Sequence, residues 1–191
     1  APTVLISSAD VVVVLVPDDE QASVYWHAIE PLLAPGALLV FARGLALGTR
    51  VFEPRSHDVV LVTGELGASP GRCRVAVHHD ATGRALERAL AYARTAFGAD
   101  ATVGTTTIPA EVDAELAALE EHAGGRDELN ASIDKLTARV RESHAPEEAK
   151  VAFYEGLRAL LAQRPPAGSL VKVADRGSGT LLHWPGPGGQ S

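Results

Sequence analysis

The sequence lacks several features that would place it in a specialised class. Its 191 residues include one cysteine and no methionine. Cys73 has no partner for an intrachain disulfide, and it is interpreted as a small core residue of a strand. No apolar run approaches the ~18 residues of a membrane-spanning helix, and the first residues lack the basic start and apolar region of a secretory signal. We expect a cytoplasmic protein that does not enter membranes.

Positive charge is also scarce. The chain has 17 Lys+Arg against 24 Asp+Glu, a formal net charge of −7, and its longest basic run is Arg139-Val140-Arg141. A nucleic-acid-binding surface needs clustered basic residues, so this class of partner is not expected. Abundant Ala, Arg, Val and Gly with little Lys is typical of proteins from GC-rich bacteria.

The sequence does contain one strongly apolar segment. Val11–Val16 consists of six consecutive branched aliphatic residues, so it has no polar side and is predicted to be a strand buried on both faces. Such strands are typical of parallel sheets covered by helices on both sides. Residues 37–41 and 59–62 repeat the pattern, whereas 73–77 alternates and should lie nearer an edge. The fold class is therefore α/β.

Helical patterns fill much of the remaining chain. One helix should begin at Pro17-Asp18-Asp19, where the acidic residues are cap candidates, and another after Asp80–Gly83. From Pro109 onward strands give way to three amphipathic helices and then a hairpin, predicted over 109–123, 127–142, 146–163 and 170–183. We divide the chain into a partial Rossmann-like parallel α/β domain (1–108), a helical region (109–165) and a hairpin with a Gly/Pro-rich tail (166–191).

Several phrases of the sequence together resemble one family. They are Ala9-Asp-Val-Val-Val-Val-Leu-Val-Pro-Asp18, Pro35-Gly-Ala37, Phe41-Ala42 with Gly44, and Val75-Ala-Val-His-His-Asp-Ala-Thr-Gly-Arg-Ala-Leu-Glu-Arg-Ala-Leu-Ala-Tyr-Ala93. They are similar to ketol-acid reductoisomerase, the NADPH- and magnesium-dependent enzyme of branched-chain amino-acid synthesis. The resemblance covers roughly residues 9–108 and is weaker over 109–163, which is similar to the family's helical domain.

The resemblance implies a cofactor site that this sequence does not complete. In the family, a glycine-rich turn after the first strand binds the dinucleotide phosphates through backbone N–H groups. No G-x-G-x-x-G occurs in the 191 residues. The chain is expected to begin just before the fourth strand of the family's nucleotide domain, so no NADPH cofactor is expected.

The family's catalytic cations are also replaced. Where the family has a His after Phe-Ala this chain has Arg43, and where it has a Lys after Pro this chain has Glu65. Both residues follow predicted strands, at the edge where open α/β sheets bind ligands. Their opposite charges fit either a plain salt bridge or an oxyanion-binding group beside a general base.

The resemblance likewise implies four magnesium-binding carboxylates, of which two remain in kind. They are Glu115 and Glu155, whereas Leu119 and Ala159 stand at the other two positions. Two carboxylates are too few for two bridged magnesium ions, so no metal is expected.

If the resemblance brings Glu115 and Glu155 together, from one subunit or two, one of them should keep its proton and act as a general acid near Arg43. A lone exposed Glu155 is the alternative.

Two other groups of polar residues are weaker candidates. Glu111, Glu115 and His122 share one helical stripe, which fits a ligand set but more often is a solvated face. His78-His79 come at the end of a strand, yet a structural role is favoured for them because the family carries a His in this phrase without a catalytic role.

Two functions from different classes are compatible with these residues. The first is a reductoisomerase-like enzyme that performs a non-redox isomerisation, cyclisation or proton transfer on a carbonyl metabolite, in bacterial specialised metabolism. The second is a non-catalytic binding or partner protein, and a residual NADPH- and magnesium-dependent reductoisomerase comes third. The expected partners are a small-molecule substrate and a second copy of the chain. A homodimer is expected because a sheet without its first half exposes Val11–Val16 or the neighbouring strand as an apolar edge.

Overall fold

The computed structural model describes residues 6–52, 54, 56–64, 71–122, 126–162, 170–174 and 179–183. Its elements follow the chain in the order β1 (Val11–Val14), α2 (Asp18–Val24), a π-helical turn (Tyr25–Ile29), β2 (Leu38–Phe41), α3 (Leu45–Gly48), β3 (Asp58–Gly64), β4 (Arg72–His79), α4 (Ala85–Phe97), β5 (Thr102–Thr105), α5 (Ile108–His122), α6 (Arg126–Glu142), α7 (Glu147–Ala162), β6 (Leu170–Ala174) and β7 (Gly179–His183). Among the described helices, none is long and apolar enough to cross a membrane.

The main sheet has five strands in the order β1-β2-β3-β4-β5 and is Rossmann-like. Strands β1, β2 and β3 are parallel, β4 is antiparallel to β3, and β5 is parallel to β4. The α/β class is confirmed, but the expectation of an all-parallel sheet is wrong at β4. Seven residues, 65–71, separate β3 from β4, and a parallel crossover needs a dozen or more. Strand β5, which is short and contains a glycine, was not predicted.

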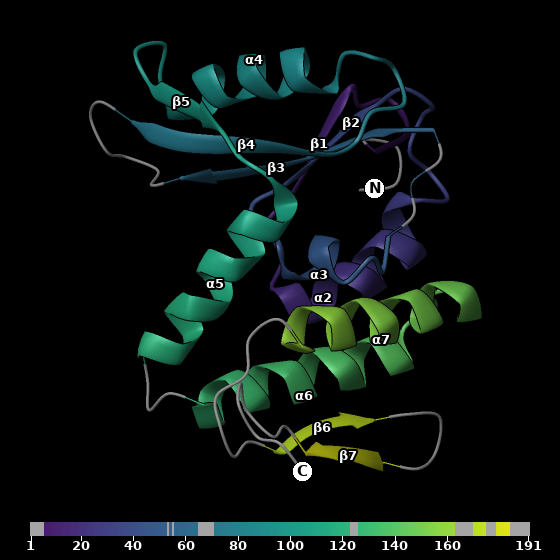
Figure 1. Ribbon diagram of the computed structural model, residues 1–191. Coiled ribbons are helices and arrows are strands. Elements are labelled where there is room, and N and C mark those ends of the chain that lie inside the picture. Colours follow the sequence, from purple (N-terminus) through teal and green to yellow (C-terminus); the bar gives the residue numbers. More distant parts are fainter. Residues whose placement is uncertain are drawn as a thin grey trace.

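Helices cover the two faces of this sheet unequally (Figure 1). On one face α4 packs mainly over β3 and β4 and closes a small apolar core around Leu38, Val60 and Val75. On the other face α2, the π-helical turn, α3 and α5–α7 enclose the larger core, centred on Phe41, Phe52 and the inner side of the helical region. The candidate functional site lies beside this larger core.

Strand β1 differs from the prediction. It forms one edge of the sheet, where Val11 and Val13 are 41% and 37% exposed and Leu15 just beyond it is 72% exposed. Only Val14 is fully buried, and Val12 packs against the larger core. The expectation of burial on both faces is therefore wrong, because α4 is centred on β3 and β4 and does not extend over the edge strand.

The helical region follows the predicted periodicity. The three predicted helices are confirmed as α5, α6 and α7, with bounds that differ by at most one residue, and β6 and β7 pair as the predicted antiparallel hairpin. The hairpin lies beside α6. Gly156 of α7 packs directly on the backbone of Thr49, so α7 approaches the end of α3 closely. The Gly/Pro-rich tail at 184–191 lies outside the described residues.

Candidate functional site

Polar side chains gather at the edge of the sheet that the carboxyl ends of its parallel strands form. Because β1, β2 and β3 are parallel, their carboxyl ends meet there, and they are followed by Asp18 after β1 and Arg43 after β2. The antiparallel β4 begins at the same edge, with Arg74 near its start. Helix α5 carries Glu111 and Glu115 to this edge, where both bind groups from the strands. Open α/β sheets bind ligands at such positions.

Arg43 forms the centre of this cluster. Its Nε donates to Asp18 Oδ2 at 2.5 Å, and its Nη2 lies 2.7 Å from Glu115 Oε1. The backbone N–H of Gly44 donates to Glu115 Oε2 at 3.0 Å. Burial alone would lower the pKa of Arg43, but the two carboxyl groups raise it above its ordinary value. The Arg43 side chain is half exposed, so part of its guanidinium remains available to a ligand.

The side chain of Glu115 is 15% exposed and lies within this cluster. Its pKa is raised, first by burial and then by the negative charge of Asp18, while Arg43 and the Gly44 N–H act in the opposite direction. Asp18 Oδ1 is buried and has no hydrogen-bond partner among the described residues. The carboxyl group of Asp18 therefore disfavours ionisation of Glu115, which raises the pKa of Glu115.

One helical turn earlier, Glu111 has the opposite environment. Arg74 donates to it through Nε at 2.5 Å and Nη2 at 3.0 Å, and Thr63 Oγ1 donates at 2.9 Å. The hydrogen bond from Arg74 lowers the pKa of Glu111, outweighing the effect of burial. The interpretation of Glu111 as part of a solvated face is therefore wrong, since it is 7% exposed.

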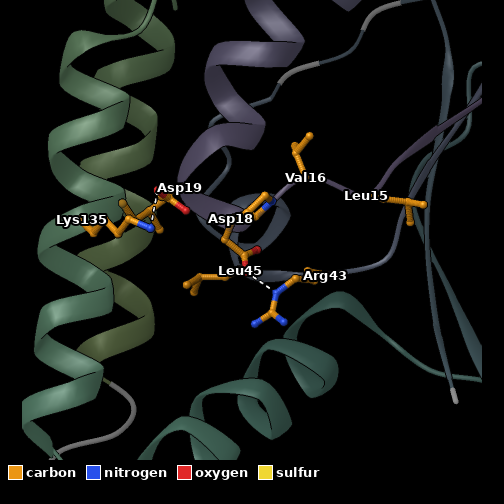
Figure 2. Close-up of a pocket in the computed structure, with 9 residues that line it drawn as sticks. Leu15, Val16, Asp18, Asp19, Arg43, Leu45 and Lys135 are labelled. Carbon is orange, nitrogen blue, oxygen red and sulfur yellow. Dashed lines mark hydrogen bonds and ion pairs between the residues drawn. The ribbon is translucent and has the colours of Figure 1, made fainter.

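Two cavities lie on either side of Arg43. The first has a volume of about 400 Å³ and is mostly apolar, with Asp19 and Lys135 forming an ion pair of 3.0 Å at its wall (Figure 2). The second has about 460 Å³ and is walled by small residues and by Arg74, Glu111 and Glu115. Their shared residue is Arg43, which contacts both spaces. A ligand in either cavity could therefore reach the guanidinium, and one in the second could reach Glu115.

The structure brings together only some of the predicted site residues that it describes. Arg43 and Glu115 are in direct contact, whereas Glu65 lies outside the described residues. Glu155 is exposed on α7, and the groups that shift the pKa of Glu115 are Asp18, Arg43 and Gly44. Within this chain, then, Asp18 is the carboxyl group beside Glu115. An approach of Glu155 from a second subunit stays a prediction.

Sequence reasoning missed Asp18 because its position favoured helix capping. The helix cap is Pro17, and no side chain makes a cap hydrogen bond to α2. Asp18 faces Arg43 instead, and Asp19 pairs with Lys135 of α6 (Figure 2). An acidic pair directly after a strand was the available signal, because that position faces the ligand-binding edge in this class of sheet.

His78 and His79 lie at the opposite edge. They end β4, which runs antiparallel to β3, so they neighbour the beginning of β3 at Val59. Burial lowers the pKa of His78, although a hydrogen bond with the backbone of Phe52 opposes this. The histidines do end a strand, as expected, but this strand ends away from Arg43, and the structural role favoured for them fits that position. The side chain of His122 lies outside the described part.

Comparison with known proteins identifies the family. Residues 3–102 match the family model of the acetohydroxy acid isomeroreductase NADPH-binding domain. The chain belongs to this family. Acetohydroxy acid isomeroreductase and ketol-acid reductoisomerase are two names for the same enzyme, so the resemblance found in the sequence is confirmed.

Solved structures agree on the fold. An NADH-preferring ketol-acid reductoisomerase from an uncultured archean matches 82% of this chain with a TM-score of 0.55 and 24% identity. A semialdehyde dehydrogenase NAD-binding protein from Cupriavidus necator, solved with calcium and NAD, matches 88% with a TM-score of 0.53 and 16% identity, covering 68% of that protein. A putative oxidoreductase from Jannaschia sp. CCS1 matches 83% of this chain with a TM-score of 0.50 and 12% identity, covering 78% of that protein. The chain spans half the length of the archaeal reductoisomerase.

The described residues show how this chain occupies the positions at which the reductoisomerase resemblance implies cofactors. Among the described residues, no group of three or more His, Cys, Asp or Glu side chains could hold a metal ion. Glu115, at a metal position of the family, is bound to Arg43 and Gly44 instead. No glycine-rich phosphate-binding turn occurs in the sequence.

Proposed function

We propose that this reductoisomerase-family protein catalyses a non-redox reaction, an isomerisation, cyclisation or proton transfer, on a small carbonyl compound. The observation that carries the proposal is the raised pKa of Glu115 beside Arg43 and Asp18, next to a cavity of about 460 Å³. A largely buried carboxyl group whose pKa is raised is suited to general acid catalysis.

In the proposed reaction, the carbonyl oxygen of the substrate lies against the half-exposed Arg43. Glu115 donates its proton to that oxygen while a water molecule takes a proton from the carbon next to the carbonyl group. The electron pair of that breaking C–H bond forms the carbon–carbon double bond of an enol, and the guanidinium stabilises the negative charge that develops on the oxygen. The Glu115 carboxylate that results is held by Arg43 and by the Gly44 N–H. Return of a proton from water to carbon, and of the enol proton to Glu115, restores the site without any change in oxidation state.

Proton exchange tests this proposal before the natural substrate is known. The protein is incubated in D₂O with a panel of small 2-oxo acids and hydroxyketones, and NMR follows the exchange of protons next to the carbonyl group. We expect exchange with at least one compound, loss of at least tenfold in rate in Glu115→Gln, and normal rates in the exposed control Glu148→Gln. An unchanged rate in Glu115→Gln, or no exchange across the panel, contradicts the proposal.

A non-catalytic binding role is the second candidate, and the pairing of both cavity arginines favours it. Arg43 and Arg74 are each neutralised by an α5 glutamate, as in a site that is held rigid. In this case the same compounds would shift the NMR signals of the Gly44 amide without exchanging protons. Micromolar, saturable NADPH binding would instead support the third hypothesis, a residual reductoisomerase.

We also propose a homodimer that forms through the β1 edge. Val11 and Val13 are exposed there, and within Val11–Val14 no proline, lysine or bulge protects the strand. Light scattering should give twice the mass of the 19.9 kDa chain at low micromolar concentration. Val13→Lys should yield a folded monomer, and a wild-type monomer under these conditions would contradict the proposal.

A further inference from the structure

Two histidines lie together on the surface, outside the candidate functional site. His27 belongs to the π-helical turn Tyr25–Ile29, and His144 belongs to the connection between α6 and α7. Their ring centres are 4.8 Å apart with the planes inclined by 36°, and both residues are exposed. Neither histidine takes part in the proposed reaction, so a role for this pair is independent of that reaction.

Both histidines are carried by firmly anchored backbone. On the π-helical turn, Tyr25 and Ile29 are 1% and 3% exposed, and the N–H of Glu30 bonds the carbonyl of Tyr25 at 2.8 Å. Turns of this kind are rare and are frequent at functional sites. Beside His144, the buried Ser143 hydroxyl donates to the carbonyl of Val140 at 2.7 Å and accepts the N–H of Ala145 at 3.3 Å. Little backbone ordering is needed to bring the rings to one ligand.

The ring separation fits a shared metal ion. A cation bound to one nitrogen of each ring at about 2.0–2.1 Å would lie about 3.2 Å from each ring centre. Ring centres 4.8 Å apart then give a nitrogen–metal–nitrogen angle of about 100°, between the octahedral value of about 90° and the tetrahedral value of about 109°. Rotation of the exposed rings is enough to turn the nitrogens toward a common point.

We propose that His27 and His144 form a surface site for a late first-row divalent cation such as Zn²⁺. Imidazole ligands select zinc, copper and nickel over magnesium, which prefers oxygen. Since no group of three or more ligand-type side chains occurs among the described residues, water fills the other positions and binding is micromolar rather than nanomolar. The ion joins the π-helical turn to the α6–α7 connection and so stabilises the docking of the helical region.

Zinc titration of the full chain, after chelator treatment and removal of any histidine tag, tests the site. We expect one Zn²⁺ per chain by calorimetry and an unfolding temperature that rises with Zn²⁺ but not with Mg²⁺. His27→Gln and His144→Gln should each weaken zinc binding at least tenfold and abolish the thermal shift, whereas His79→Gln should behave as the wild type. Equal zinc affinity in all four proteins, or no saturable binding, overturns the proposal.

Copper spectroscopy of the wild type and of the two histidine variants supplies a second readout. One equivalent of Cu²⁺ should show hyperfine coupling to two imidazole nitrogens in the wild type and to one in either variant. Because both side chains are exposed, the metal-free variants should unfold at the wild-type temperature. Coupling to a single nitrogen in the wild type would mean that the two rings do not share an ion, and the proposal would fail.

Discussion

Asp58 and Glu115 lie at opposite ends of the strands of the same sheet, and their pKa values are shifted in opposite directions. Asp58, at the beginning of β3, accepts hydrogen bonds from the Thr82 N–H at 2.9 Å, the Thr82 hydroxyl at 2.7 Å and Arg88 Nη1 at 2.8 Å. Burial raises its pKa, but these donors lower it further than burial raises it, so the pKa of Asp58 is below its ordinary value. Glu115, at the other edge, also faces an arginine, yet its pKa is raised.

The two sites differ in the number of carboxyl groups that bind the arginine. Arg88 binds the single carboxylate of Asp58 and uses its other donors on the backbone carbonyls of Gly36 and Asp10, so it ties the beginnings of three strands to α4. Arg43 is shared by two carboxyl groups, Asp18 and Glu115, and one positive charge cannot compensate two buried negative charges. The first edge is therefore a structural joint, whereas the second holds a carboxyl group whose pKa is raised.

The largest effect should come from breaking the structural joint. Asp58→Asn removes the charge that Arg88 and Thr82 enclose, and it should lower the free energy of unfolding by about 3 kcal/mol, measured by urea denaturation. Because the folded-state pKa of Asp58 is depressed, its contribution is present above the unfolded-state pKa and is lost as the pH falls through the folded-state pKa. The variant should therefore show a flatter acid limb. A decrease in the free energy of unfolding below about 1 kcal/mol would show that Asp58 does not act as a structural joint and so does not differ from Glu115 in this way.

A smaller effect is expected at Glu111, which shares α5 with Glu115 but resembles Asp58 in its pKa. Glu111→Gln should cost about 1 kcal/mol, because Thr63 can still donate to the side-chain oxygen and Arg74 is more than half exposed. Proton exchange on the substrate panel should fall far less than in Glu115→Gln. Equal losses of activity in the two variants would show that Glu115 is not distinguished by its proton.

Stability should change least at Glu115 itself. Glu115→Gln should alter the free energy of unfolding at pH 7 by less than about 1 kcal/mol, since it removes both an unfavourable buried charge and an ion pair. A raised acid pKa makes the wild type lose stability as the pH rises from the unfolded-state pKa through the folded-state pKa, and the variant should lack that slope. Parallel stability curves for the two proteins between about pH 4 and 8 would contradict the raised pKa.

The final prediction concerns the cause of that shift and expects almost no change in stability. Asp18→Asn should lower the pKa of Glu115, followed by NMR of its side-chain carboxyl carbon, because the neighbouring negative charge is removed. Glu148→Gln, on the exposed side of α7, serves as the control and should leave this pKa unchanged. A pKa of Glu115 that does not move in Asp18→Asn would leave burial as its sole cause.

Much of the architecture could be predicted from the sequence because apolar periodicity is a local signal. The runs at 37–41 and 59–62 became β2 and β3, and the 3–4 spacing after residue 109 became α5, α6 and α7 within one residue at each end. The direction of β4 was also accessible, since seven residues cannot complete a parallel crossover. The phrases at 9–18 and 75–93 were enough to identify the family.

Only the tertiary structure decided the environment of each charge and the exposure of β1. Asp18 and Arg43 are 25 residues apart, and Gly44 and Glu115 are 71 apart, so no spacing rule connects them. They meet because parallel strands end at one edge and α5 crosses it. The run Val11–Val14 is as apolar as β2, yet its outer face is exposed, because burial depends on a strand's place in the sheet. The sequence states which residues can be buried or charged, and the packing of the strands and helices determines what each of them faces.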